Sequence, residues 1–264
     1  MPSLITAKQL QSAQTLPFCY VCGELFVAGV ARNMDHVPPR ACFAVGDRGS
    51  PLKLPTHSAC NAAYAITDER VGQFMSTIDK RPPPPGKLRI KSLVQPIGHT
   101  GKAQVTMTNV NIYGTVERWV RAFHAALYGE PAPPETRFGI QTPFLVAVPS
   151  KDGPVPDKFR PQHILFVQII KDNRAARNVD RIACNNGKLR YECVWHTTMK
   201  GPWICVFALD FHQWRYRAAL HNHEPRGCTG FYQLPSGAAP EPATKATRLG
   251  INLPNYERLD PFGR

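Results

Sequence analysis

Long hydrophobic runs are missing from this sequence. No apolar stretch approaches the roughly 20 residues that a membrane-spanning helix requires, and the N-terminus lacks the basic start and continuous apolar core of a secretory signal. We therefore expect a cytoplasmic protein with no membrane partner. No internal repeat is visible, and a hydrophobic content of 43% is ordinary for a folded chain. The length of 264 residues allows one large domain or two small ones.

Acidic residues are also scarce. The chain has 19 Asp and Glu against 32 Lys and Arg, so its formal net charge is +13. The excess lies in residues 71–217, which carry 21 basic and 10 acidic residues, whereas residues 1–70 carry 6 and 5. This charge favours a polyanion such as nucleic acid as the partner, contacted mainly by the middle of the chain. A solvated basic surface without a partner is the alternative.

The eight cysteines favour a metal site over a disulfide framework, because an unsecreted chain of this size is expected to keep its thiols reduced. Cys19 and Cys22 form one pair of possible ligands, and His57 and Cys60 form another, each with two residues between the donors. Such a turn presents both donors to one Zn²⁺, and two turns complete a tetrahedron. The remaining cysteines fall at no ligand spacing and are expected in the core: Cys42, Cys184, Cys193, Cys205 and Cys228.

Residues suited to a different metal lie next to these ligands. Asp35 and His36 stand between the two pairs, and Asn61 follows the last cysteine. Carboxylate and amide oxygens are ligands for hard ions such as Mg²⁺ or Mn²⁺, and an imidazole of pKa about 6.5 can accept a proton from water at neutral pH. Side chains alternate along a strand, so Asp35 and His36 lie on opposite faces unless the following Pro38-Pro39 bends the backbone.

The order and spacing of these groups resemble the HNH endonucleases, whose core is the ββα-metal fold, and in particular the zinc-containing branch with an Asp-His-Val-Pro-Pro motif, here residues 35–39. The resemblance covers about the first 80 residues. It implies that His36 is the general base, that Asp35 and Asn61 bind a catalytic Mg²⁺ or Mn²⁺, and that the four thiol and imidazole donors hold a structural zinc. The implied activity is metal-dependent hydrolysis of phosphodiester bonds in DNA.

Three departures from the family pattern leave other interpretations open. His57 stands where a second cysteine is more usual, and it could bind the catalytic ion instead of zinc. Ala65 stands where many members have histidine, and the family's middle Asn or His has no clear counterpart between Arg40 and Pro55. A non-catalytic, zinc-stapled module that binds nucleic acid or protein is therefore the alternative, and an enzyme acting on RNA or a small phosphoester is a third possibility. A second metal could use His221, His223 and Cys228.

We predict an α+β fold in which the N-terminal ββα-metal module is followed by a helix packed on an antiparallel sheet. Proline-rich segments suggest the boundaries. The predicted order is the module at 1–80, a linker at 81–87, a basic α+β domain at 88–222 and a tail rich in Pro, Gly and Ala at 223–264. The oligomeric state is left open.

Local patterns predict the individual elements. In the module we expect a hairpin-like knuckle at 18–27, an extended segment at 33–37, an irregular stretch at 40–56 and a helix from Ser58. An apolar stripe predicts a helix at 112–128, similar to an accessory helix of bacterial and phage proteins with the same motif. Strands are predicted at 88–94, 103–108, 144–148, 164–171, 188–195 and 203–211, with Asn186-Gly187 as a tight turn and the last 40 residues irregular.

Basic residues near the module are the candidates for phosphate contacts. Their spacing does not distinguish those that would touch DNA from those that serve the fold. The candidates are Arg40, Arg48, Lys53, Lys80, Arg81, Lys87, Arg89 and Lys91.

Overall fold

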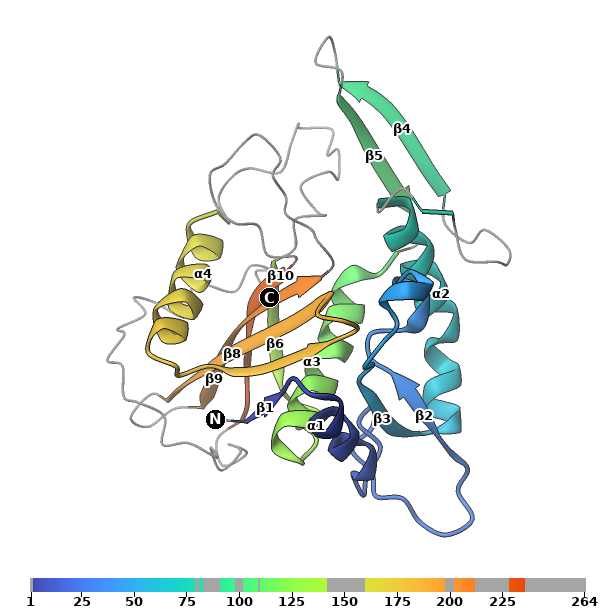
Figure 1. Cartoon of the computed structure of the whole chain (residues 1–264), viewed down its shortest axis with the longest axis vertical. Helices are drawn as coiled ribbons and strands as arrows, with labels where there is room; N and C mark the ends of the chain where they lie inside the picture. The colour runs from blue at the N-terminus through green and yellow to red at the C-terminus, as the bar shows by residue number, and fades with distance from the viewer. Residues whose placement is uncertain are drawn as a thin grey trace.

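The fold is mixed α+β, as predicted, and is built around one large sheet (Figure 1). The computed structural model describes residues 2–78, 81–82, 91–97, 102–108, 110–141, 160–197, 202–211 and 228–235. Within them, no helix is long and apolar enough to cross a membrane. The helices are α1 (Ala7–Ser12), α2 (Ser58–Ile78), α3 (Ile112–Tyr128) and α4 (Arg160–Ala175), with short 3₁₀ turns at Ala13–Thr15, Arg40–Cys42 and Val45–Asp47. The strands are β1 (Ser3–Leu4), β2 (Arg32–His36), β3 (Lys53–His57), β4 (Lys91–Ile97), β5 (Lys102–Thr108), β6 (Arg137–Gln141), β7 (Asp180–Cys184), β8 (Leu189–Thr197), β9 (Trp203–Phe211) and β10 (Cys228–Gln233).

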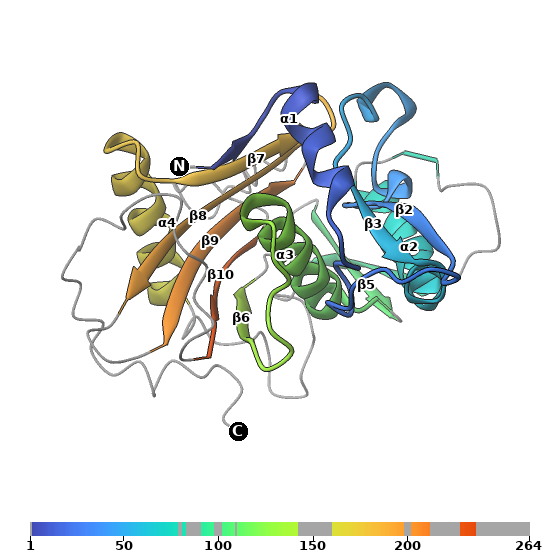
Figure 2. The same cartoon turned by 90° about the horizontal axis from the view of Figure 1, so that it is seen from below.

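The large sheet has six strands in the order β1-β7-β8-β9-β10-β6. All neighbours are antiparallel except β1, which pairs in parallel with β7. Helices α3 and α4 lie on opposite faces of this sheet (Figure 2). Alternation along β9 explains the two layers, because Phe207 and Leu209 join the core on the α3 side while Val206 and Ala208 pack with α4.

In the first 80 residues, the predicted extended segment at 33–37 corresponds to strand β2, the predicted knuckle at 18–27 is closed by an isolated bridge between Phe18 and Leu25, and the predicted helix from Ser58 is α2. Strand β2 pairs antiparallel with β3, and α2 begins at the residue after β3. The prediction that residues 40–56 are irregular was wrong for β3, where Leu54 and Thr56 are buried on one face. Proline is rare in strands, so the presence of Pro55 argued against a strand in the sequence-based prediction. A proline is tolerated there because a two-stranded sheet is all edge.

One hydrophobic core joins this module to the large sheet. Phe43, from the loop between β2 and β3, packs its ring 5.4 Å from that of Phe211 on β9, and Trp119 of α3 lies 5.2 Å from the same ring. The loop also pairs with the β7–β8 turn, since the amides of Asn185 and Asn186 donate to the carbonyls of Ser50 and Gly49 at 3.0 and 3.1 Å. The loop between β2 and β3 and the β7–β8 turn lie side by side in both views (Figures 1 and 2).

Several local predictions were confirmed. The predicted helix at 112–128 is α3, and it ends at Gly129 in the left-handed conformation. The Asn186-Gly187 turn joins β7 to β8, and both residues have positive φ, while the predicted strands at 88–94, 103–108, 188–195 and 203–211 correspond to β4, β5, β8 and β9 within a few residues. The five cysteines expected in the core are all buried: Cys42, Cys184, Cys193, Cys205 and Cys228.

Two element predictions were wrong. Residues 164–171 belong to helix α4, because Phe166, Ile169 and Ile170 repeat at helical spacing toward the sheet although their composition is typical of a strand. The last 40 residues are not irregular throughout, since β10 pairs with β9 on one side and β6 on the other. The predictions for residues 83–87 and 144–148 and for the histidines at 221 and 223 lie outside the described residues.

Replacing Phe43 with alanine should destabilise the whole molecule. The ring is fully buried between the module and the sheet, so its removal is expected to lower the free energy of unfolding by about 3–5 kcal/mol. Urea unfolding followed by circular dichroism and tryptophan fluorescence measures this loss, and both probes should report one transition because the core is shared. Val45→Ala, in the same loop but 79% exposed, should change stability by less than about 0.5 kcal/mol. Separate transitions for the two probes would contradict a shared core.

Candidate metal centre

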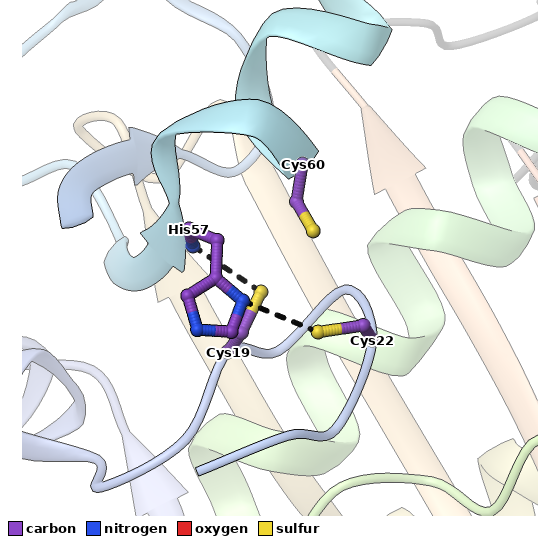
Figure 3. Close-up of side chains that lie close together, drawn as sticks. All are labelled: Cys19, Cys22, His57 and Cys60. Carbon is purple, nitrogen blue, oxygen red and sulfur yellow. Dashed lines mark hydrogen bonds between the residues drawn. The ribbon is translucent and has the colours of Figure 1, made fainter. Parts of the chain in front are cut away.

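Cys19, Cys22, His57 and Cys60 converge on one point (Figure 3). Their ligand atoms all lie within 4.8 Å of one another, as the spacing of the two pairs predicted. The two segments reach this point from different elements: His57 is the last residue of β3 and Cys60 lies in the first turn of α2, whereas Cys19 and Cys22 flank a tight turn. Gly23, with φ of +79°, donates its amide to the Cys19 carbonyl at 2.8 Å and closes that turn.

Hydrogen bonds hold the four side chains in place before any metal is considered. The backbone amide of His57 donates to Cys19 Sγ at 3.4 Å, and the Thr56 hydroxyl lies 3.3 Å from the same sulfur. The imidazole Nδ1 of His57 lies 3.4 Å from Cys22 Sγ, and the edge of the Phe26 ring packs on its other side at 5.0 Å between centroids. These contacts place Nδ1 in the cluster, so the geometry groups His57 with the three cysteines.

The thiols differ in acidity because they crowd together. Burial raises the pKa of Cys19, but hydrogen bonds from Thr56 and nearby backbone groups outweigh it and bring the pKa below its ordinary value. Burial, followed by repulsion from Cys19 and Cys22, raises the pKa of Cys60 to about 12. Three thiolates can therefore coexist here only with a cation among them. Four-coordinate Zn²⁺ would supply that charge, and its bonds of about 2.3 Å to sulfur would require donors about 3.8 Å apart, which small side-chain rotations could achieve from the present spacing.

Asp35 lies in a buried polar cluster instead of an open pocket. The residue is 7% exposed, and its carboxylate accepts a hydrogen bond from the Tyr20 hydroxyl. Burial raises the pKa of Asp35, while the Tyr20 hydroxyl and the charge of Arg118 lower it again. The carboxylate of Asp68 is close enough to be affected by Asp35, and burial raises the pKa of Asp68 to about 6. Two carboxylates thus share the positive charge of one arginine.

Arg118 is the member of this cluster that the sequence reasoning missed. It lies on α3, is 4% exposed, and donates from Nη2 to Asp68 Oδ1 at 2.5 Å. Its guanidinium also stacks 4.4 Å above the Tyr64 ring of α2. The Nε and Nη1 atoms are buried with no hydrogen-bond partner among the described residues. Asp68 lies seven residues after Asn61, hence on the same face of α2, and that spacing could have identified it; nothing in the sequence marked Arg118.

His36 occupies the other face of β2. Its half-buried imidazole faces two cations, Lys53 across the strand pair and Arg40 beyond the Pro-Pro turn. Burial first, and then the charges of Lys53 and Arg40, lower its pKa to about 4. The imidazole is therefore neutral at pH 7, in the form that can accept a proton.

Asn61 completes the set of predicted catalytic residues. It lies in the first turn of α2 and donates from Nδ2 to Asn33 Oδ1 of β2 at 3.3 Å. The His36 backbone amide donates to the Asp35 carboxylate, but no hydrogen bond or ion pair between side chains joins any two of Asp35, His36 and Asn61 in the described part of the chain. The fold thus gathers the four candidate zinc ligands closely, whereas the side chains of the three catalytic candidates have separate neighbours around one strand.

Purified protein should contain about one equivalent of zinc, and Cys19→Ser should lose it, because three ligands hold zinc much more weakly than four. Metal analysis after gel filtration measures the content, and circular dichroism should show reduced thermal stability of the variant. Cys184→Ala is the matched control, since Cys184 is a buried cysteine of β7 outside the cluster. A Cys19→Ser protein that retained its zinc would rule out the four-ligand site.

Arg118→Met should lower the free energy of unfolding by about 3–5 kcal/mol, because it leaves the buried Asp68 and Asp35 carboxylates without their cation. Urea unfolding measures the loss. Adding Asp68→Asn should recover part of it by removing one unpaired charge. Arg137→Met on β6 is the control, since Arg137 is exposed and is expected to contribute less. Equal losses for the two arginines would show that the buried cluster contributes no more to stability than an exposed arginine does.

Comparisons with known proteins identified no relative of this chain. No family model, no curated protein and no solved structure matches the chain. The resemblance to HNH endonucleases therefore rests on residues 19–61 alone, and the function has to be argued from the site itself.

Proposed function

We propose that this protein is a metal-dependent endonuclease of the HNH type that hydrolyses phosphodiester bonds in DNA. One observation carries the proposal: the Cys3His cluster joins the knuckle to the β3–α2 junction, directly beside the strand that bears Asp35 and His36. Zinc in this cluster would have a structural role, because all four of its positions are filled by protein ligands.

The proposed chemistry divides among three residues. The oxygens of Asp35 and Asn61 are of the type that holds Mg²⁺ or Mn²⁺, and such an ion would offset charge on the scissile phosphate. To bind it, Asp35 and Asn61 would exchange their present contacts with Tyr20 and Asn33. His36 would take a proton from the attacking water. Its low pKa keeps it neutral, and a phosphate bound nearby would raise that pKa toward the range of an effective base.

A second candidate is a zinc-stapled module that binds nucleic acid without cutting it. The environment of Asp35 favours this candidate: the carboxylate is buried, accepts a hydrogen bond from Tyr20 and faces the charge of Arg118. A carboxylate already neutralised in this way has less need of a divalent ion. Both candidates share the zinc centre and the DNA partner, and they differ only in whether an ion can reach Asp35.

Supercoiled plasmid incubated with zinc-loaded protein and Mg²⁺ or Mn²⁺ should be nicked, and His36→Ala should reduce the rate by about 10²–10⁴-fold, the usual contribution of a general base. Gel electrophoresis measures the rate. Met34→Ala, two residues earlier on β2 and 37% exposed, should cleave as the wild type does. Parallel reactions with RNA and with a small phosphodiester test the third possibility.

Cleavage at equal rates by wild type and His36→Ala would point to a contaminating nuclease. If neither protein cleaves with any divalent ion, yet both bind DNA, the non-catalytic candidate is the correct one.

A further inference from the structure

The face of β2 and β3 that carries His36 is strongly basic. Side chains alternate along β2, so Arg32, Met34 and His36 share one face. Asn33 and Asp35 share the other, where they contact Asn61 and Tyr20. The antiparallel register places Lys53 directly opposite His36 on the same face.

Two cations lie beside the imidazole, and a third lies farther along the same face. Lys53 and Arg40 both lie near enough to His36 to lower its pKa. Arg32 lies four residues before His36, about 13 Å away at the roughly 3.4 Å rise per residue of an antiparallel strand. The ring of Phe26 supports the Arg32 guanidinium at 5.7 Å, and the side chains of Arg32 and Arg40 remain exposed.

No carboxylate among the described residues forms an ion pair with these cations. Asp35 belongs to the opposite face, and Asp47 pairs with Lys188 at 3.7 Å. No acidic group is among those that shift the pKa of His36. The cations of this face therefore repel one another without compensation from a neighbouring carboxylate, and a bound anion would supply that compensation.

Two neighbouring arginines, Arg48 and Arg81, have structural roles that differ from those of the three cations. Arg48 donates from Nε to the Phe43 carbonyl at 3.3 Å, and Arg81 donates from Nη2 to the Cys42 carbonyl at 2.9 Å. Both tie the loop after β2 in place. The side chains of Arg32, Arg40 and Lys53 make no hydrogen bond or ion pair with the described residues, so their donors are available to a ligand.

We propose that Arg32, Arg40 and Lys53 form a phosphate-binding face for the DNA backbone and place one phosphate at His36. Phosphate oxygens would accept charge-assisted hydrogen bonds from these side chains, which is the usual way in which proteins position a duplex without reading its sequence. The inference rests on the proposed function, since it names the surface that would deliver the substrate to the general base. It also assigns DNA contacts to the module, whereas net charge alone favoured the middle of the chain.

The test measures DNA binding without cleavage. Fluorescence anisotropy of a labelled duplex, with zinc-loaded full-length protein and no added divalent ion, gives the dissociation constant at several salt concentrations. Each phosphate contact contributes about 0.9 to the slope of log affinity against log salt. Arg32→Gln, Arg40→Gln and Lys53→Gln should each weaken binding and each lower the slope by about that amount.

Two controls decide where the contacts lie. Lys8→Gln on α1 and Lys171→Gln on α4 remove exposed charges elsewhere, and both should leave the slope unchanged. Unchanged slopes for the three face variants, a reduced slope for Lys171→Gln alone, or no salt-dependent binding by the wild type would each overturn the proposal.

The binding test and the nuclease test can give different answers. Reduced slopes in a protein that never cleaves DNA would support the phosphate-binding face and contradict the enzymatic role. Cleavage by the wild type, together with normal DNA binding by the three face variants, would support the enzymatic role and contradict the phosphate-binding face.

Discussion

The structure depends on the meeting of three thiols and one imidazole at the start of α2. As thiolates the three cysteines would repel one another, and burial raises the pKa of Cys60. Yet the turn closed by Gly23, the end of β3 and the first turn of α2 all direct the four groups to the same point. A Zn²⁺ ion would resolve this conflict, because it would replace mutual repulsion with four bonds to one centre. The same convergence brings the Cys19–Cys22 turn against the junction of β3 and α2.

Strand β2 then separates two electrostatic environments. On one face, Asp35 lies in a buried cluster with Tyr20, Asp68 and Arg118, where each charge depends on its neighbours for compensation. On the other face, His36 lies among uncompensated cations. Because neighbouring residues on a strand point in opposite directions, the adjacent Asp35 and His36 belong to different environments. A catalytic role for both requires a substrate or an ion that spans the edge of the strand.

The module is not stabilised by zinc alone. Phe43 packs into the core of the large sheet, and Arg118 extends from α3 into the charged cluster beneath Asp35. A change in α3 can therefore reach the candidate site through packing and through charge, although α3 contributes none of the predicted catalytic residues. The region after residue 88, which displayed no chemistry in its sequence, in this way forms part of the wall of the site.

Local spacing was enough to predict the zinc ligands, α3 and the Asn186-Gly187 turn, because each depends on residues close together in the chain or on a fixed ligand geometry. It failed for β3 and α4, where the partner strand or sheet face determines the conformation that a β-branched or proline-containing segment adopts. The opposite faces of Asp35 and His36 follow from the alternation of side chains along a strand, whereas the pairing of Arg118 with Asp68 was decided only by tertiary structure. Charges 50 residues apart meet through helix packing, and no pattern along the chain encodes which buried carboxylate an arginine will reach.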